Sequence, residues 1–209
     1  MPHLTRRTLA TAAATLALAL TGCGQANGAG GAAGTAASGD MTLGNPNAPV
    51  KVVEYASLTC PHCAEFHENV FPEFKKKYID TGKVHFTFKE FLTPPASVAA
   101  AGSLLARCAG KDKYFDVISA VFHSQSEWQT SGPRDSLLRV AQSTGMSEDQ
   151  FEKCVGDREA LQALQARVEK SAKEGNIQFT PTFVINGKKA KEGAMTMAEL
   201  DAAIAAASK

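Results

Sequence analysis

Two apolar segments in the first half of the chain have the pattern of β-strands. Residues 49–57 (PVKVVEYAS) and 83–91 (KVHFTFKEF) are rich in β-branched and aromatic side chains, and the second segment alternates apolar with polar positions. Between them, apolar side chains recur with the four-residue spacing of a helix face. These are Phe66, Val70, Phe74 and Tyr78. The pattern predicts strand, helix and strand, joined by a connection long enough for a parallel crossover.

The pattern from about residue 95 to residue 176 is helical, with one short amphipathic segment following another. Ser147 and Gln150 have the spacing of a capping box. Glycines stand where three of these helices are expected to end, at Gly110, Gly145 and Gly175. This part of the chain is therefore predicted to be an all-helical insertion.

The last part of the chain returns to strands. Residues 180–193 predict a hairpin, because the Asn186-Gly187 pair suits a type I′ turn. Residues 196–208 predict a final helix with Thr196 as its N-cap. The expected order is β-α-β, a helical insertion, then β-β-α.

The N-terminus has the pattern of an export signal. Arg6 and Arg7 precede an apolar run from Leu9 to Leu20, which is too short to span a bilayer comfortably as a helix. The run ends in Leu-Thr-Gly-Cys23, which resembles a bacterial lipobox. We predict a lipoprotein signal peptide over residues 1–22 and lipidation at Cys23; an ordinary secretory signal cleaved further on is the alternative. The arginine pair is compatible with twin-arginine export and with any basic leader.

Composition separates the remaining regions. Residues 23–40 are mostly Gly, Ala and small polar residues, as in a flexible, lipid-anchored tether, and residues 41–209 are long enough for one domain. With 22 basic and 21 acidic residues, the chain is close to neutral, which argues against nucleic acid as a partner.

Four cysteines follow Cys23. Cys60 and Cys63 form a Cys-Pro-His-Cys motif where the first strand gives way to the helix. This spacing puts both side chains on one face of a helix N-terminus, where free amides and the helix dipole favour a thiolate. Cys108 and Cys154 are far apart in two helical segments, and in an exported protein we expect them to form a structural disulfide, two free thiols being the alternative.

The order of elements and the Cys60-Pro61-His62-Cys63 motif resemble the DsbA-like thiol oxidoreductases, which have a thioredoxin fold carrying a helical domain. The resemblance covers residues 41–209 and includes the lead-in LGNPNAPVKVVEYAS and Thr180-Pro181. It implies an α/β thioredoxin fold with an inserted helical subdomain, and a cis Pro181 against the active-site cysteines. From the residues alone, with no local signal for a cis bond, Pro181 would be a trans proline that opens an edge strand.

Each candidate site residue has an expected role. Cys60 is the exposed nucleophile, with Pro61 at the first helical position, and Cys63 is the resolving thiol. His62 is expected to donate to the thiolate or to stabilise its charge. The resemblance further implies that Thr180 offers backbone groups to a substrate peptide.

Glu54 matches a family glutamate, so it is either a buried acid that handles a proton near Cys63 or a surface carboxylate. Lys89 is a possible partner for it. His67, His85 and His123 have the pattern of structural or surface residues.

The sequence therefore favours an extracytoplasmic, membrane-anchored monomer that donates the Cys60–Cys63 disulfide to reduced exported proteins. The resemblance implies reoxidation by a DsbB-like membrane protein. A reductase or isomerase on the same fold is the alternative. A metal-binding lipoprotein using Cys60, Cys63 and His62 or His67 is less favoured, because a closed zinc site needs four ligands. No cofactor and no metal are expected.

Overall fold

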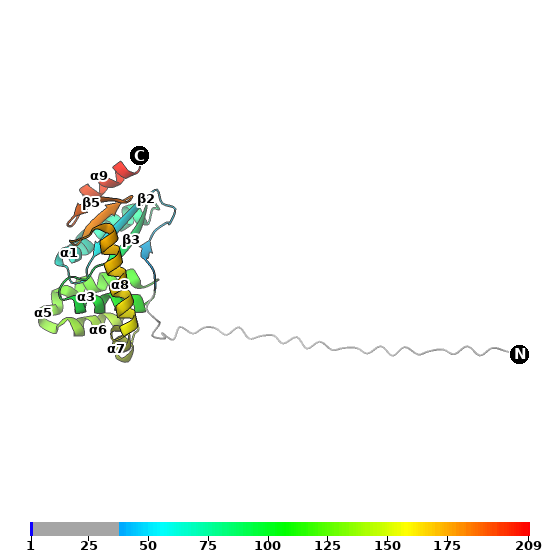
Figure 1. Cartoon of the computed structure of the whole chain (residues 1–209), viewed down its shortest axis with the longest axis vertical. Helices are drawn as coiled ribbons and strands as arrows, with labels where there is room; N and C mark the ends of the chain where they lie inside the picture. The colour runs from blue at the N-terminus through cyan, green and yellow to red at the C-terminus, as the bar shows by residue number, and fades with distance from the viewer. Residues whose placement is uncertain (2–37) are drawn as a thin grey trace. The chain divides into compact units, whose positions relative to one another are not determined.

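The computed structural model describes Met1 and residues 38–209 of the 209-residue chain. The predicted signal peptide beyond Met1, Cys23 and most of the predicted tether lie outside the described residues. Figure 1 gives the labels of the elements.

Among residues 38–209 the strands form one mixed sheet of five, in the order β1-β3-β2-β4-β5. The two central strands, β2 and β3, are parallel and the other neighbours are antiparallel, which confirms the predicted parallel crossover. The strands are β1 Met41–Leu43, β2 Val50–Ala56, β3 Val84–Glu90, β4 Thr182–Ile185 and β5 Lys188–Glu192.

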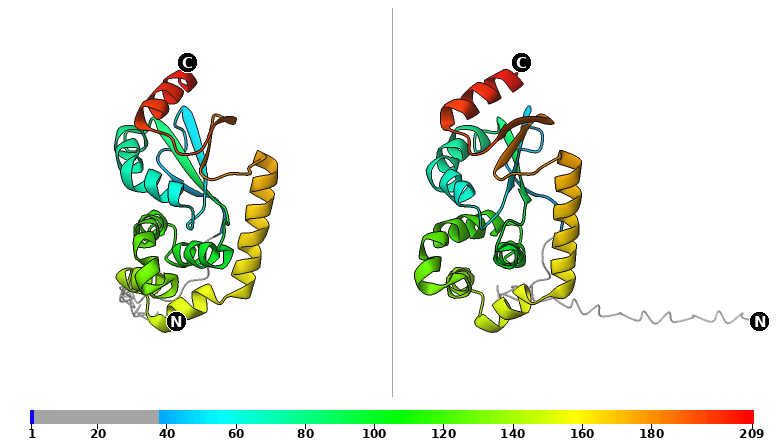
Figure 2. Two further views of the ribbon diagram at one scale, coloured as in Figure 1. Left: turned by 90° about the vertical axis from the view of Figure 1, so that its left-hand side faces the viewer. Right: turned by 60° about the vertical axis from the view of Figure 1, so that its left-hand side comes forward.

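Helices cover the sheet and extend beyond one of its ends. Figure 2 shows α1 and α8 on opposite sides of the sheet, with the helices from α3 to α7 gathered at one end. The first three helical segments are α1 Pro61–Asn69, α2 Phe71–Phe74 and the π-helical turn η1 Lys75–Ile79. Between β3 and β4 come α3 Ala96–Cys108, α4 Tyr114–Ser124, the 3₁₀ turn η2 Gln125–Glu127, α5 Trp128–Ser131, α6 Pro133–Ser143, α7 Glu148–Val155 and α8 Arg158–Gly175. The last helix is α9 Met197–Ala207.

The register of the central strands places the site. Val50 lies opposite Val84 at one end of the parallel pair, and Ala56 lies opposite Glu90 at the other. The carboxyl ends of both strands therefore meet at the same edge of the sheet, next to the start of α1. This is where open α/β sheets commonly bind their ligands.

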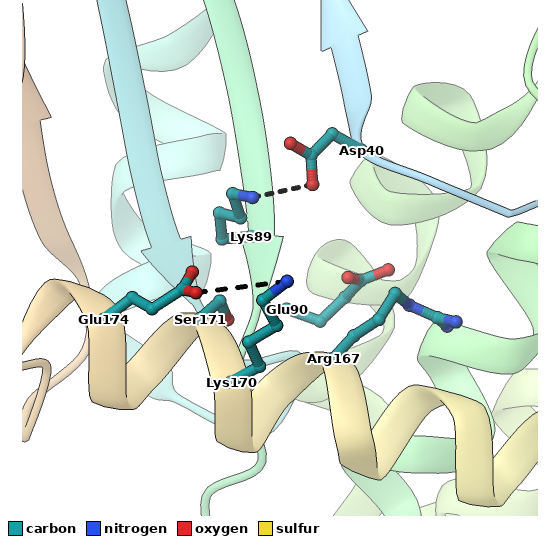
Figure 3. Close-up of a pocket in the computed structure, with 7 residues that line it drawn as sticks. All are labelled: Asp40, Lys89, Glu90, Arg167, Lys170, Ser171 and Glu174. Atoms are coloured by element: carbon teal, nitrogen blue, oxygen red, sulfur yellow. Dashed lines mark hydrogen bonds and ion pairs between the residues drawn. The ribbon is translucent and has the colours of Figure 1, made fainter.

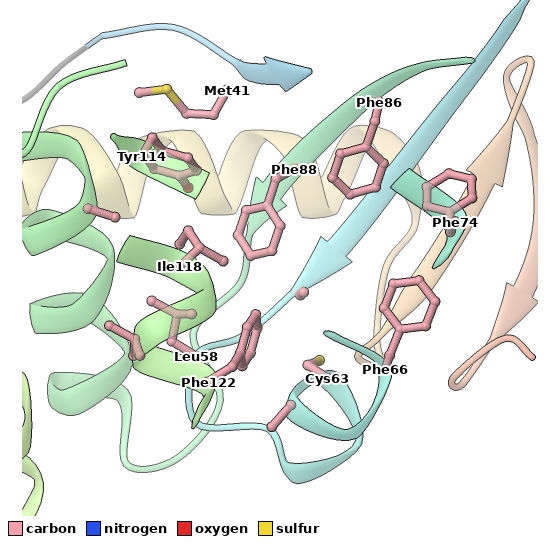
Figure 4. Close-up of a cluster of buried hydrophobic side chains, with 14 of the residues drawn as sticks. Met41, Leu58, Cys63, Phe66, Phe74, Phe86, Phe88, Tyr114, Ile118 and Phe122 are labelled. Carbon is pink, nitrogen blue, oxygen red and sulfur yellow. The ribbon is translucent and has the colours of Figure 1, made fainter. Parts of the chain in front are cut away.

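Aromatic side chains fill the space between the sheet and the helices. Figure 4 shows Cys63 between Phe66 of α1 and Phe122 of α4, with Phe88 of β3 nearby. Cys63 is itself part of this buried cluster and is 0% exposed. The motif's second cysteine therefore lies in apolar surroundings, although its neighbour in sequence, His62, is exposed.

Most predicted boundaries agree with the structure, with two differences. The short strand β1 had no pattern to reveal it, because three residues are too few for a recognisable alternation. At the end of α8 the left-handed residue is Asn176, with φ 48°, and not Gly175. Gly175 is instead the last helical residue, and a Cβ there would lie 2.8 Å from the Tyr55 hydroxyl, so a close approach of helix and strand favours glycine.

Candidate active site

Cys60 lies at the junction between β2 and α1. Its backbone is extended, with φ −88° and ψ 117°, and it is the N-cap residue of a helix that begins at Pro61. Proline suits this first helical position because its missing N–H would have no helical partner there. The amides of Cys63 and Ala64 donate to the Cys60 carbonyl, each at 3.1 Å. The sulfur therefore lies at the positive end of the α1 dipole.

A hydroxyl cluster fixes the loop that leads into Cys60. The Thr59 hydroxyl donates to the Thr93 carbonyl at 2.9 Å. In turn, the Thr93 amide and hydroxyl both donate to the Ser57 hydroxyl, at 3.1 and 2.8 Å. These bonds join the loop after β2 to the loop after β3, so the position of Cys60 does not depend on α1 alone.

The loop before β4 lies against Cys60. The peptide bond between Thr180 and Pro181 is cis, and the Cys60 Sγ donates to the Thr180 carbonyl at 3.3 Å. The structure holds both Cys60 and Cys63 as free thiols. The prediction that Cys60 is exposed is wrong: it is only 7% exposed, because its sulfur lies against the Thr180 loop.

The surroundings of Cys60 favour the thiolate. Its pKa is lowered from 9.0 to about 5, chiefly by a hydrogen bond with the Cys63 side chain and further by Thr180 and by the backbone amides of Cys63 and His62. Burial opposes this shift but does not cancel it. The lowered pKa therefore favours the thiolate of Cys60 at neutral pH.

The surroundings of Cys63 have the opposite effect. Burial raises the pKa of the Cys63 thiol well above 9.0, and the hydrogen bond to Cys60 and the negative charge of Glu54 raise it further. The two cysteines are only three residues apart, yet one is held as a thiolate and the other as a thiol. Such opposite shifts distinguish a nucleophile from its resolving partner.

Glu54 is a buried acid and not a surface carboxylate. It is 0% exposed in β2, and its Oε2 lies 2.8 Å from Nε2 of His67 on α1. His67, predicted to be structural or at the surface, is 2% exposed and was missed as a site residue. The signal that could have found it is its position four residues after Cys63, which places both on the same face of α1.

The suggested pairing of Lys89 with Glu54 is wrong. Glu54 lies opposite Phe88 in the β2–β3 register, whereas Lys89 lies opposite Tyr55. Because neighbouring side chains in a strand point to opposite faces, Lys89 faces away from Glu54. Its ammonium instead donates to Asp40 at 2.7 Å.

His62 contributes to the site mainly through its backbone. Its side chain is exposed, and its Nδ1 lies 3.7 Å from the Glu65 carboxylate. The contribution of His62 to the lowered Cys60 pKa comes from its backbone amide. The imidazole therefore faces the solvent through which a partner must approach.

Phe179, next to Thr180, is a further residue that sequence reasoning missed. Its side chain is 60% exposed, and within residues 38–209 it is the only exposed large hydrophobic side chain. A lone exposed phenylalanine has no special meaning in a sequence pattern; only its place beside Cys60 makes it a candidate contact for a substrate.

The second pair of cysteines lies outside the buried cluster that contains Cys60 and Cys63. Cys108 and Cys154 form a disulfide with 6.3 Å between their Cα atoms, which links the end of α3 to α7. Leu104 and Leu164 pack around it in a separate small apolar cluster. The bond closes a long loop within the helical part and is enclosed by side chains.

A charged hollow of ≈250 Å³ lies between β3 and α8 (Figure 3). Asp40 pairs with Lys89 there, and Lys170 lies 3.9 Å from Glu174. Beside it, the buried Glu90 accepts from Arg107 at 2.6 and 2.8 Å and from the Tyr114 hydroxyl at 2.9 Å. These bonds tie β3 to the helical part.

The described residues hold neither a cluster that could bind a metal ion nor a helix that could cross a membrane. Residues 38–209 contain no group of three or more His, Cys, Asp or Glu side chains placed to hold a metal ion. Among the same residues, no helix is long and apolar enough to cross a membrane.

Several known proteins are similar to this chain. A family model described as Thioredoxin matches residues 36–206. A protein of Rickettsia bellii named as a protein-disulfide oxidoreductase is 37% identical over 71% of this chain, but the match spans only 57% of that protein. Disulfide bond formation protein D of Bacillus subtilis is 31% identical, with 72% of this chain and 69% of that protein covered.

A solved structure shows the same architecture. The crystal structure of Wolbachia pipientis alpha-DsbA1 matches with a TM-score of 0.72 and 31% identity, covering 80% of this chain and 92% of that one. The predicted thioredoxin fold with a helical insertion is thereby confirmed. The chain belongs to the thioredoxin-fold thiol:disulfide oxidoreductases of the DsbA type.

Proposed function

We propose that this protein is an oxidase, which donates a Cys60–Cys63 disulfide to reduced exported proteins during their folding. The observation that carries the proposal is the pKa of Cys60, lowered to about 5, beside a Cys63 whose pKa is raised. A stabilised thiolate stabilises the reduced form of the pair, so its disulfide is a strong oxidant.

The proposed reaction has two exchange steps. A substrate thiolate attacks the Cys60 sulfur, the bond between Cys60 and Cys63 breaks, and Cys63 leaves with the electron pair and takes up a proton. A second substrate thiolate then attacks the substrate sulfur of this mixed disulfide, and Cys60 leaves as its stabilised thiolate. The substrate gains a disulfide, and the pair is reduced by two electrons.

Glu54 is proposed to handle the proton of Cys63. Its carboxylate is buried and acts electrostatically on Cys63, and its Oε1 has no hydrogen-bond partner in the described part of the chain. A buried carboxylate with a free lone pair is well suited to accept or return a proton in a site that excludes water.

The loop before β4 is proposed to bind the substrate peptide. Thr180 brings a backbone carbonyl to within 3.3 Å of the Cys60 sulfur, cis Pro181 follows it, and Phe179 adds exposed apolar surface. Unfolded polypeptides expose both backbone groups and apolar side chains, so such a surface suits many substrates.

The setting of the reaction is also a proposal. Residues 1–22 are proposed to be a lipoprotein signal, Cys23 the lipid anchor and residues 23–40 a tether for a monomeric domain, with the helical insertion at about 95–176. The domain would then work outside the cytoplasm, at the membrane or cell surface. We propose a DsbB-like membrane protein as the reoxidant, by resemblance to the family.

The direction of transfer can be tested in a single turnover. Oxidised protein is mixed with an equal amount of a reduced, unfolded polypeptide carrying two cysteines, and the products are trapped in acid and resolved by mass. We expect nearly complete transfer of the disulfide to the polypeptide. The reverse mixture, reduced protein with the oxidised polypeptide, should react little; ready transfer in that direction would establish a reductase instead.

A further inference from the structure

His67 is a buried histidine in the candidate active site to which the proposed reaction has so far given no role. It lies on α1, one turn after Cys63, and its Nε2 is 2.8 Å from the Glu54 carboxylate. Burial of both groups is nearly complete. A hydrogen bond of this kind, between an imidazole and a carboxylate shielded from water, is strong and directional.

The rest of the His67 ring is surrounded by aromatic side chains. The ring stacks on Phe122 of α4, with 4.5 Å between centroids and 23° between planes, and lies 4.6 Å from Phe71. Phe66 and Phe88 complete the contacts at 5.5 and 5.8 Å. The charged group that contacts the imidazole is the Glu54 carboxylate, from β2. On α1 itself, the titratable residue one turn before His67 is Cys63.

Glu54 connects this histidine to the reacting cysteine. One carboxylate oxygen binds His67, while the other, Oε1, is buried and has no hydrogen-bond partner among residues 38–209. The same carboxylate acts electrostatically on the Cys63 thiol. Glu54 therefore has one oxygen committed to the histidine and one available for a proton.

We propose that His67 and Glu54 together store one exchangeable proton for Cys63, with His67 as the positioning residue that orients the Glu54 carboxylate. The inference rests on the proposed disulfide exchange. When the disulfide is donated, Cys63 leaves with the sulfur–sulfur electron pair and takes this proton through Glu54. When the pair is reoxidised, Cys63 returns the proton to Glu54 and His67, attacks the sulfur of Cys60, and releases the oxidant's thiolate.

The choice of histidine as the partner has a physical consequence. An arginine beside Glu54 would be a permanent cation, whereas the imidazole of a histidine can also release a proton. We therefore expect the pH dependence of the resolving step to change when the histidine is replaced by a permanent cation.

The test follows the resolving step alone. Reduced protein is mixed with a large excess of oxidised glutathione, which forms the mixed disulfide at Cys60, and release of glutathione by Cys63 is followed by acid quenching and mass spectrometry from pH 5 to pH 8. We expect Glu54→Gln to slow this step roughly 10²–10⁴-fold at pH 7, the usual contribution of a general acid or base, and His67→Gln to slow it by a smaller factor. The double variant should be no slower than the slower single variant, because both act through one proton.

Two further variants separate the proton from packing. His67→Arg keeps a positive partner for Glu54 that cannot release its proton, so the pH profile of the rate should differ from that of the wild type. His123→Gln, the same kind of change as His67→Gln at an exposed position of α4, should leave both the rate and the pH profile unchanged. Wild-type rates in His67→Gln, or a wild-type pH profile in His67→Arg, would overturn the proposal.

The outcome can be separated from that of the proposed oxidase function. Absorbance of the Cys60 thiolate at 240 nm is expected to keep its midpoint near pH 5 in His67→Gln, which shows that the nucleophile is intact. Failure of the wild-type protein to oxidise a reduced polypeptide would overturn the oxidase function but not the proton store. Additive effects in the double variant would overturn the proton store but not the oxidase.

Discussion

The two cysteine pairs of this chain have the same chemical groups in opposite surroundings. Cys60 and Cys63 are three residues apart at a helix N-terminus, where one sulfur reaches the Thr180 carbonyl and the other lies in the aromatic core. Cys108 and Cys154 are 46 residues apart and bridge two helices within an apolar cluster. The first pair is set up for exchange and the second for crosslinking.

The difference lies in what surrounds the sulfurs. Hydrogen bonds and the dipole of α1 stabilise a thiolate at Cys60, which favours the reduced form of that pair. In contrast, the Cys108–Cys154 bond closes a long loop, and this removes conformational freedom from the unfolded chain. A disulfide between Cys60 and Cys63 is therefore suited to exchange, whereas the disulfide between Cys108 and Cys154 stabilises the fold.

The largest expected effect comes from removing the proposed nucleophile. Cys60→Ser should abolish disulfide transfer, because serine cannot form the mixed disulfide. The matched control replaces Cys108 and Cys154 together with alanine, and we expect it to retain most of the activity. Transfer to a reduced polypeptide measures both, and normal activity of Cys60→Ser would refute the assignment.

The next expected effect is on stability, and here the Cys108–Cys154 pair should matter more than the Cys60–Cys63 pair. Replacing Cys108 and Cys154 with alanine should lower the free energy of unfolding by about 4 kcal/mol in the chain-entropy account, less any strain in the native bond. The Cys60 pKa should stay near 5. Urea unfolding of the oxidised protein gives the first quantity, and absorbance at 240 nm of the reduced protein gives the second.

The reduced protein should lose stability as the pH falls from about 9 to about 5. The pKa of Cys60 is about 5 in the folded protein, against an ordinary value of 9.0. Its contribution to the free energy of unfolding is therefore complete above pH 9, declines between pH 9 and 5, and is absent below pH 5. Unfolding of the reduced wild type, compared with reduced Cys60→Ser from pH 5 to 8, measures the contribution.

Two conditions check this pH dependence. The oxidised protein has no titrating Cys60 and should not show it. Above pH 9 the raised pKa of Cys63 opposes folding, because the buried thiol stays protonated while the unfolded one ionises. A stability difference that is constant from pH 5 to 8 would contradict the lowered Cys60 pKa.

The smallest effect concerns the helix that carries Cys154. The Ser147 hydroxyl accepts from the Gln150 amide, and the Gln150 side chain accepts from the Ser147 amide, at the start of α7. Ser147→Ala should cost about 1 kcal/mol of unfolding free energy without changing transfer activity. Loss of activity would mean that the helical part controls Cys60, against the separation drawn between the two pairs.

Local patterns predicted the elements of this fold well. The Asn186-Gly187 turn has positive φ at both residues, 46° and 78°, as a type I′ turn needs, and the capping boxes begin at Ser147 and Thr196. Each of these depends on residues within a few positions of one another. The strand β1 could not be predicted, because only its pairing with β3 defines it.

The site was predictable where its geometry is local. Cys60 and Cys63 follow from one helix N-terminus. The partner of Glu54, in contrast, depends on the register between β2 and β3 and on the packing of α1 against them. The sequence suggested only Lys89 as this partner. The alternation of side chains across the sheet turns Lys89 away from Glu54, and the packing of α1 brings His67 to the carboxylate instead.

The reduction potential of the Cys60–Cys63 pair tests the central claim most directly. The domain is equilibrated with mixtures of reduced and oxidised glutathione, and the two forms are separated after acid quenching. A pair with a stabilised thiolate should have a potential above about −180 mV, on the oxidising side of protein disulfide isomerase. A value near −270 mV, typical of thioredoxin, would contradict the account and make the protein a reductase.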